Sequence, residues 1–168
     1  MATEGAKVVL TKNYNGEAIT LKANVNHAVD AESRDDERQP QGQANNAQGE
    51  MVCKPDFTIE IQKGDETLGI NCEFSHYDEE VDEEQDPDTV EDLFHISEIS
   101  LFNKEFAEHD YLIAGDVMDV VMYDLLMNLL NERGINDQFI RSFVDYCTVY
   151  EHGQYIGFLE HMKRFLAK

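Results

Sequence analysis

The first half of the chain alternates apolar and polar residues with a period of two, which is typical of strands with one buried face. Residues 7–26 hold two such runs around Asn15-Gly16, a dipeptide that favours a two-residue hairpin turn. One face of the second run is apolar, so the alternation and the turn predict the same register. The expected facing pairs are Tyr14 with Glu17, Leu10 with Leu21, and Val8 with Ala23.

A second hairpin is predicted over residues 57–74, with its turn at Gly64-Asp65. The alternation then resumes at residues 93–102, but it changes phase after Ile96. A β-bulge near Glu98 would bring the apolar residues on both sides of the phase change to one face. A short strand is expected within residues 110–114. The second hairpin should pair Lys63 with Glu66, Ile61 with Leu68, Ile59 with Ile70, and Phe57 with Cys72.

The last third of the chain changes to helical periodicity. A helix is predicted from Asp116, which would cap it while Asp119 complements its dipole, to Gly134. Asn136 would cap a second helix that runs to the end, with a local bend at its two glycines, Gly153 and Gly157. Strands first and helices last predict a single α+β domain over residues 1–168, with a helical end at 116–168. The apolar positions of the first helix are Val117, Val120, Val121, Leu125, Leu129 and Leu130.

Two segments contain almost nothing that a core could bury. Residues 27–50 are rich in Asp, Glu, Gln, Asn and Gly, and we expect a mobile loop there. Residues 78–92 contain ten carboxylates and no cation. This acidic run suits a solvated linker, weak binding of several ions, or a surface for a basic partner; it lacks the spacing of a calcium loop. Its carboxylates are Asp78, Glu79, Glu80, Asp82, Glu83, Glu84, Asp86, Asp88, Glu91 and Asp92.

The charge of the whole chain narrows the choice of partners. Its 168 residues carry a formal net charge of −22, far more than solubility requires. Such a chain repels phosphate, so any role with nucleic acid should be indirect. No apolar run approaches the length of a membrane span, so no membrane insertion is expected.

Candidate chemistry is sparse. The sequence has no phosphate-binding loop, dinucleotide motif, zinc-protease motif or serine-nucleophile motif, and its six histidines lack ligand spacing. We therefore expect no catalytic residue, no cofactor and no defined metal site. The three cysteines suggest buried free thiols, because Cys53 would lie about 13 Å from the position that faces Cys72, too far for a disulfide.

The C-terminal third also resembles a known family. The stretches YDLLMNLLNERGIND (residues 123–137) and EHGQYIGFLEHMKRFL (residues 151–166) resemble the end of the mitochondrial glycoprotein family, the mitochondrial acidic matrix proteins. The first hairpin, the acidic run and the strand after it follow the order of that family. The resemblance therefore covers nearly the whole chain.

The resemblance implies a twisted antiparallel sheet of about seven strands flanked by helices, in a doughnut-shaped homotrimer. It implies a non-enzymatic, multi-ligand adaptor or chaperone-like protein of the mitochondrial matrix, linked to RNA processing or editing, translation and respiratory function. We expect the acidic run to bind basic proteins, including RNA-binding or ribosomal proteins, and the alternative is an acidic ion-buffering or storage protein. The acidic start suggests that a matrix leader is absent from this chain. The expected oligomer contacts are Tyr155, Phe158, Leu159, Met162 and Phe165.

Overall fold

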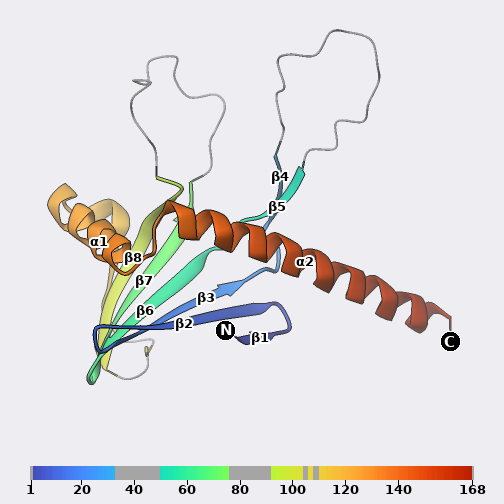
Figure 1. Cartoon of the computed structure of the whole chain (residues 1–168), viewed down its shortest axis with the longest axis horizontal. Coiled ribbons are helices and arrows are strands. Elements are labelled where there is room, and N and C mark those ends of the chain that lie inside the picture. The colour runs from blue at the N-terminus through green and yellow to red at the C-terminus, as the bar shows by residue number, and fades with distance from the viewer. Residues whose placement is uncertain (1, 33–49, 76–91, 104–105, 108–109, 168) are drawn as a thin grey trace, which may run out of the picture.

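The computed structural model describes residues 2–32, 50–75, 92–103, 106–107 and 110–167. Its main feature is a twisted, antiparallel seven-stranded sheet in the order β1-β2-β3-β6-β7-β8-β9 (Figure 1). The fold class predicted from the sequence is thereby confirmed. The strands of this sheet are β1 (Ala2–Glu4), β2 (Lys7–Tyr14), β3 (Glu17–Asn24), β6 (Phe57–Lys63), β7 (Glu66–Phe74), β8 (Phe94–Asn103) and β9 (Leu112–Ala114).

Both predicted hairpins form with the predicted register. Leu10 faces Leu21 in the first hairpin, and Ile59 faces Ile70 in the second. Asn15 and Gly16 have φ angles of 47° and 84°, so both adopt the left-handed conformation that a tight hairpin turn requires. The alternating face of β3 is buried as expected, because the register and the apolar pattern select the same side chains.

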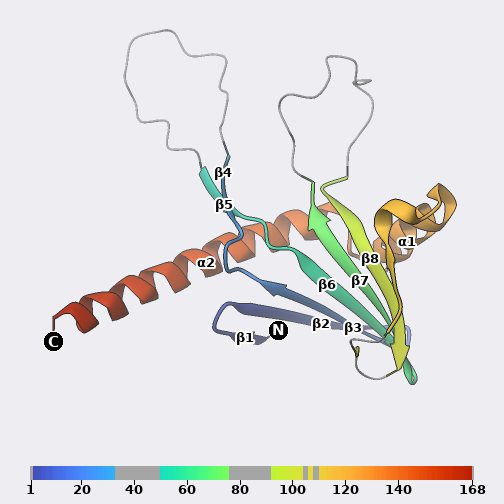
Figure 2. The same cartoon turned by 180° about the vertical axis from the view of Figure 1, so that it is seen from behind.

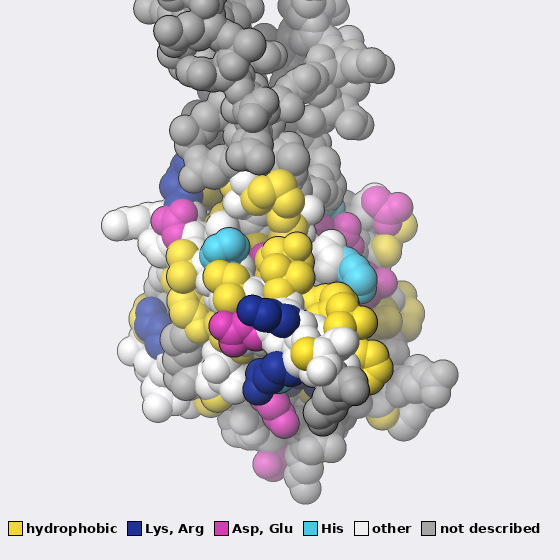
Figure 3. Space-filling model, turned by 90° about the vertical axis from the view of Figure 1, so that its right-hand side faces the viewer, with side chains coloured by type: hydrophobic (Ala, Val, Ile, Leu, Met, Phe, Trp, Pro, Cys, Tyr) yellow, Lys and Arg dark blue, Asp and Glu magenta, His cyan; other side chains and the backbone are white. Residues whose placement is uncertain are grey.

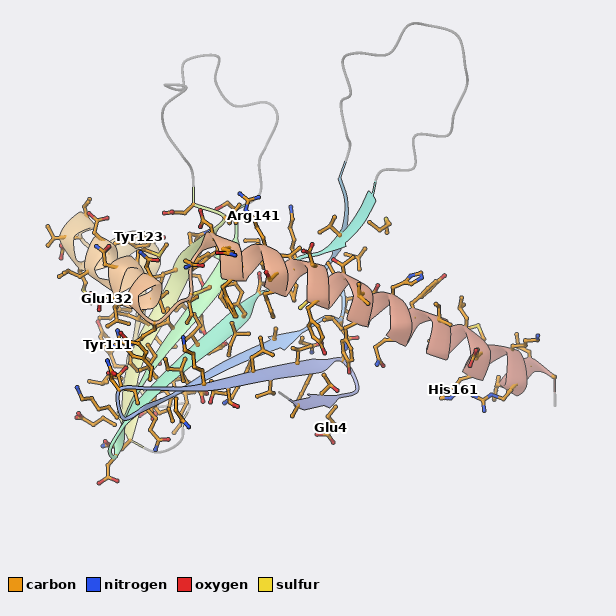
Figure 4. The ribbon with its side chains drawn as sticks, viewed as in Figure 1. Glu4, Tyr111, Tyr123, Glu132, Arg141 and His161 are labelled. Atoms are coloured by element: carbon orange, nitrogen blue, oxygen red, sulfur yellow. The ribbon has the colours of Figure 1, made fainter. Side chains whose placement is uncertain are left out.

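The phase change in β8 is a β-bulge, as predicted. Asn71 pairs with Glu98 and Cys72 pairs with Ile96, which leaves Ser97 as the extra residue. The bulge places Phe94, Ile96 and Ile99 together in the core. Ile96 also donates its backbone N–H to the Tyr123 hydroxyl, at 3.1 Å, so the bulge is tied to the first α-helix. Figure 4 labels Tyr123 on this helix.

The helical end differs from the prediction at its first helix. α1 (Val120–Glu132) begins one turn later than expected, because Asp119 and not Asp116 accepts the capping hydrogen bond from Met122 N, at 3.0 Å. Residues Gly115–Val117 form a short 3-10 turn, η1. Gly134, with a φ of 79°, ends this helical segment as predicted.

The second helix, α2, spans Asp137–Leu166. Asn136 caps it by accepting a 3.0 Å hydrogen bond from Phe139 N, as expected. The helix passes through both of its glycines, Gly153 and Gly157, as one element, so the expected bend does not interrupt it. Within the described part of the chain, no helix combines the length and the apolar character needed to cross a bilayer.

The core lies between one face of the sheet and the first half of α2. Figure 1 shows α2 crossing the sheet and continuing beyond it, while α1 stands beside β8. Phe57 lies at the centre of an aromatic cluster, with ring centroids 5.6 Å from Phe143 and 5.7 Å from Phe74. The buried residues of α2, namely Ile140, Phe143 and Cys147, all belong to its first four turns.

The expectation of a loop over residues 27–50 is wrong at both ends. Strands β4 (Val29–Glu32) and β5 (Glu50–Cys53) pair there as a separate two-stranded ribbon. The Cys53 N–H donates to the Thr148 hydroxyl of α2, at 2.9 Å, and this bond attaches the ribbon to the helix. Each of these strands is only four residues long, which is too short for alternation to be recognised in a polar segment. Residues 33–49 lie outside the described residues.

Candidate partner-binding surfaces

The acidic run joins two strands that are neighbours in the sheet. Residues 78–91 of the run lie outside the described residues. Asp92, its last carboxylate, lies within them. Ser75, after β7, donates its backbone N–H to Leu93 O at 3.2 Å and its hydroxyl to Asp92 O at 2.9 Å. Ser75 and Asp92, the described residues on either side of residues 76–91, therefore meet at one end of the β7–β8 pair.

Asp92 lies close to two other carboxylates, those of Asp124 and Asp137. Partial shielding from water raises the pKa of its carboxyl group, and the charges of Asp137 and Asp124 raise that pKa further. Asp92 and Asp137 also line a hollow of about 360 Å³ between the start of β8 and the junction of the two helices. Cationic groups would lower the repulsion among these carboxylates, so this end of the molecule favours basic ligands.

The residues predicted as oligomer contacts lie on the last four turns of α2. Their side chains are exposed, from 43% for Met162 to 78% for Phe165, and none of the last four turns of α2 contributes to the core. Figure 3 views the molecule from the side where α2 ends and shows hydrophobic side chains gathered there among a few charged ones. An exposed apolar surface of this kind is typical of sites where proteins associate, so the role of these residues in an oligomer stays a prediction. Its members are Tyr155, Phe158, Leu159, Met162 and Phe165, accompanied by Ile156 and Leu166.

A second exposed apolar surface lies on α1, and the sequence analysis missed it. Val120, Val121 and Leu125 are at least 65% exposed, whereas Leu126 and Leu130 face the core. The apolar positions of the predicted helix therefore divide between a buried side and an exposed side. Apolar residues on more than one side of α1 are the signal that could have revealed a second contact surface.

The cysteines and histidines do not form a reactive centre in the described residues. Cys53, Cys72 and Cys147 are buried free thiols, and burial raises the pKa of Cys147 to about 12. His95 lies 3.8 Å from Glu73. Among the described residues, no group of three His, Cys, Asp or Glu side chains is arranged to hold a metal ion.

The polar face of the sheet carries a row of hydrogen-bonded side chains that sequence reasoning did not identify. The Thr58 hydroxyl donates to Asn71 Oδ1 at 2.9 Å, and Asn71 Nδ2 donates to Glu98 Oε2 at 3.1 Å. The row crosses β6, β7 and β8. Alternation predicted that these residues face away from the core, but only the register across three strands shows that they are neighbours.

Comparisons with known proteins agree with this architecture. The family model described as Mitochondrial glycoprotein matches residues 2–166. Conserved regulator of innate immunity protein 3 from Caenorhabditis elegans is 34% identical over 169 residues, which cover 100% of this chain and 69% of that protein. Complement component 1 Q subcomponent-binding protein, mitochondrial, from Rattus norvegicus is 32% identical over 173 residues, 99% of this chain and 60% of that protein.

A solved structure shows the same fold. It is described as a hypothetical protein from Leishmania major and a sequence homologue of human p32 protein. The match has a TM-score of 0.64 and 15% identity, and it covers 98% of this chain and 80% of that one.

Proposed function

The chain belongs to the mitochondrial glycoprotein family, and from this premise we propose that it is a non-enzymatic adaptor that binds basic proteins through clustered carboxylates. The observation that carries the proposal is the convergence of Asp92, Asp124 and Asp137 where the acidic run enters β8. With a net charge of −22, the chain attracts cationic partners over a distance of about a Debye length, roughly 8–10 Å at physiological salt.

The partners in this proposal are basic proteins of the mitochondrial matrix, including RNA-binding and ribosomal proteins. Through them the adaptor would support RNA processing or editing, translation and respiratory function, with nucleic acid bound only indirectly. The matrix location and these roles go beyond what membership of the family shows. The chain spans only about 60% of the length of the mammalian relatives that it matches. Protease protection in isolated mitochondria tests the location, and mass spectrometry of captured proteins that elute in salt tests the partners.

A homotrimer is part of the proposal. The apolar side chains on the last four turns of α2 and on α1 are available for contacts between copies of the chain. Association of three copies would triple the charge of the particle and bring three acidic runs into one field, which would raise the encounter rate with basic partners. In this arrangement, the apolar ends of α2 hold the particle together and the carboxylates select the partner.

The deciding experiment neutralises part of the acidic run. In one variant, Gln or Asn replaces Glu79, Glu80, Asp82, Glu83, Glu84 and Asp86. We expect slower association with an arginine-rich peptide and a weaker dependence of the rate on salt, because long-range attraction sets the encounter rate. Thermal stability should stay equal or rise. Equal association rates at low salt for parent and variant would reduce the run to a linker.

A matched control separates the position of the charge from its amount. Six exposed carboxylates scattered over other elements can be neutralised together, which changes the net charge by the same amount. The control should retain most of the parent's association rate. Calorimetry with Ca²⁺ in place of the peptide tests the alternative of an ion-buffering protein, which would bind the cation and show no preference for the peptide. The control residues are Glu4, Asp65, Glu66, Glu132, Asp145 and Glu160.

A further inference from the structure

The helix α2 covers one face of the sheet, and the opposite face of the central strands carries a different set of side chains. Figure 2 shows β6, β7 and β8 from this side, with α2 on the far face of the sheet. The outward positions along β8 are Glu98, Ser100 and Phe102, and the register pairs them with Asn71, Gly69 and Thr67 on β7. This face therefore changes from acidic to aromatic along a single strand.

The acidic end of this face is concave. A hollow of about 620 Å³ lies over the β-bulge, where η1 forms one of its walls. Its charged lining includes Glu73, Glu98 and Asp116, together with His95. The amide of Asn71 holds the carboxylate of Glu98 in place through one oxygen, so the other oxygen can accept hydrogen bonds from a ligand.

The hollow continues into a second one, of about 250 Å³, which shares Asn71 and Glu98 with the first. Ser100 and Gly69 line this second hollow, together with the rings of Phe102 and Phe106. A Cβ atom at Gly69 would stand 2.7 Å from the Ser100 hydroxyl, so only glycine leaves this space open. Phe102 and Phe106 make an edge-to-face contact, with ring centroids 5.6 Å apart.

The Ser100 hydroxyl lies in the middle of the same groove. The residue is 8% exposed, and its side chain lines the second hollow beside Gly69. A hydroxyl can both donate and accept a hydrogen bond, so it can bind a backbone group of a ligand in the groove.

We propose that the two hollows form one docking groove for an extended, arginine-containing segment of a partner protein. This inference rests on the proposed function and assigns it a site separate from the acidic run. A guanidinium group would bind the free oxygen of Glu98 and the carboxylate of Glu73, and the partner's backbone would bind the Ser100 hydroxyl. The stem of a further side chain would pack on Phe102 and Phe106.

Charge complementarity selects this occupant. On the outward face of β3, Lys22 is already paired with Glu60, so it does not neutralise the groove. An anionic ligand such as nucleic acid would meet Glu73, Glu98 and Asp116. An extended segment presents alternate side chains roughly 6.6–6.8 Å apart, which matches the spacing of successive outward residues along β8.

The test measures binding of a labelled ten-residue peptide of alternating arginine and serine to the full chain by fluorescence anisotropy. The double variant Glu73→Gln with Glu98→Gln should weaken binding about tenfold, the loss expected for two partly exposed ion pairs. Gln at position 98 can still accept the bond from Asn71, so the row of side chains is retained. Ser100→Ala should weaken binding about threefold. Ala114→Lys adds a cation at the exposed wall of the first hollow, so it should weaken binding about tenfold.

The matched control is Asp145→Asn with Glu160→Gln, two exposed carboxylates on α2 that change the net charge equally. It should alter affinity less than about twofold. If the groove variants bind the peptide as tightly as this control does, while neutralisation of the acidic run weakens binding, the docking groove is wrong and the adaptor function stands. If the parent chain binds no arginine-rich peptide even at low salt, the docking groove and the adaptor function are both wrong.

Discussion

The Arg133 guanidinium holds the Glu17 carboxylate through two hydrogen bonds, 2.7 and 2.9 Å long, between groups that are 116 residues apart in sequence. The same guanidinium lies 5.7 Å from the centre of the Tyr14 ring, and Lys12 donates to Arg133 O at 2.9 Å. Arg133 ends α1, and Glu17 begins β3. The ion pair therefore fastens the turn between the two helices to the first hairpin.

Replacing Arg133 with Lys should destabilise the protein. An ammonium group cannot bind both carboxylate oxygens in the fork geometry of a guanidinium, and Glu17 is less than 10% exposed. We expect a loss of about 2–3 kcal/mol in the free energy of unfolding, measured by urea denaturation. Arg141→Lys, at an exposed position on α2, is the control and should cost less than about 0.5 kcal/mol. Equal losses in the two variants would contradict the role of the pair.

The same pair should make stability depend on pH in the acid range. The hydrogen bonds from Arg133 hold the pKa of Glu17 below its usual value, against the opposing effect of burial. A lowered folded-state pKa means that the unfolded chain takes up the proton first. The stabilisation is therefore complete above the unfolded pKa of about 4.3 and is lost as the pH falls through the folded value. Glu17→Gln should flatten the stability curve below about pH 4.3 relative to the parent.

Hairpin registers could be predicted from the sequence because two independent signals coincide. At Asn15-Gly16 the turn residues and the alternating apolar pattern both specify Leu10 opposite Leu21, and the structure has this pair. The bulge near Glu98 could be placed for a similar reason, since a phase change in a continuous strand requires an extra residue. Local chemistry determines these features.

The start of α1 and the groove could not be predicted, because each depends on tertiary contacts. Asp116 and Asp119 are both suitable capping residues, and only the position of η1 against β8 selects Asp119. The groove brings together residues from three strands, and their proximity has no signal in the sequence. The acidic run was recognisable from composition alone, whereas its proximity to Asp137 depends on how α2 packs.

Replacing Asp92 with Asn should stabilise the protein slightly at neutral pH. Shielding from water and the charges of Asp137 and Asp124 raise the pKa of Asp92, so its ionised form costs more in the folded state than in the unfolded chain. Between the unfolded and the raised folded pKa, the folded state binds more protons and stability falls as the pH rises. Differential scanning calorimetry at pH 7 should show a rise in melting temperature of no more than about 2 °C, and none at pH 3. Asp145→Asn should show no such difference, and a rise of equal size at both pH values would contradict the assignment.

The final prediction concerns the last four turns of α2. At 100° per residue, Tyr155, Phe158, Leu159 and Met162 project from one side of the helix, and all are more than 40% exposed. Burying a Phe side chain contributes about 1.5–3 kcal/mol, so a contact that includes Phe158 and Phe165 from each chain would be substantial. Phe158→Glu with Phe165→Glu should therefore lower the mass found by sedimentation velocity at micromolar concentration from that of the proposed trimer to that of one chain.

The control for this variant uses the opposite side of the same helix. Arg164→Glu changes the net charge by the same two units, and Arg164 is exposed roughly half a turn from the apolar side chains. It should leave the mass of the assembly unchanged. Because none of the last four turns of α2 contributes a buried residue, both variants should keep the helical circular dichroism of the parent. A parent that sediments as a monomer, or a double variant that keeps the parent's mass, would remove α2 from the interface.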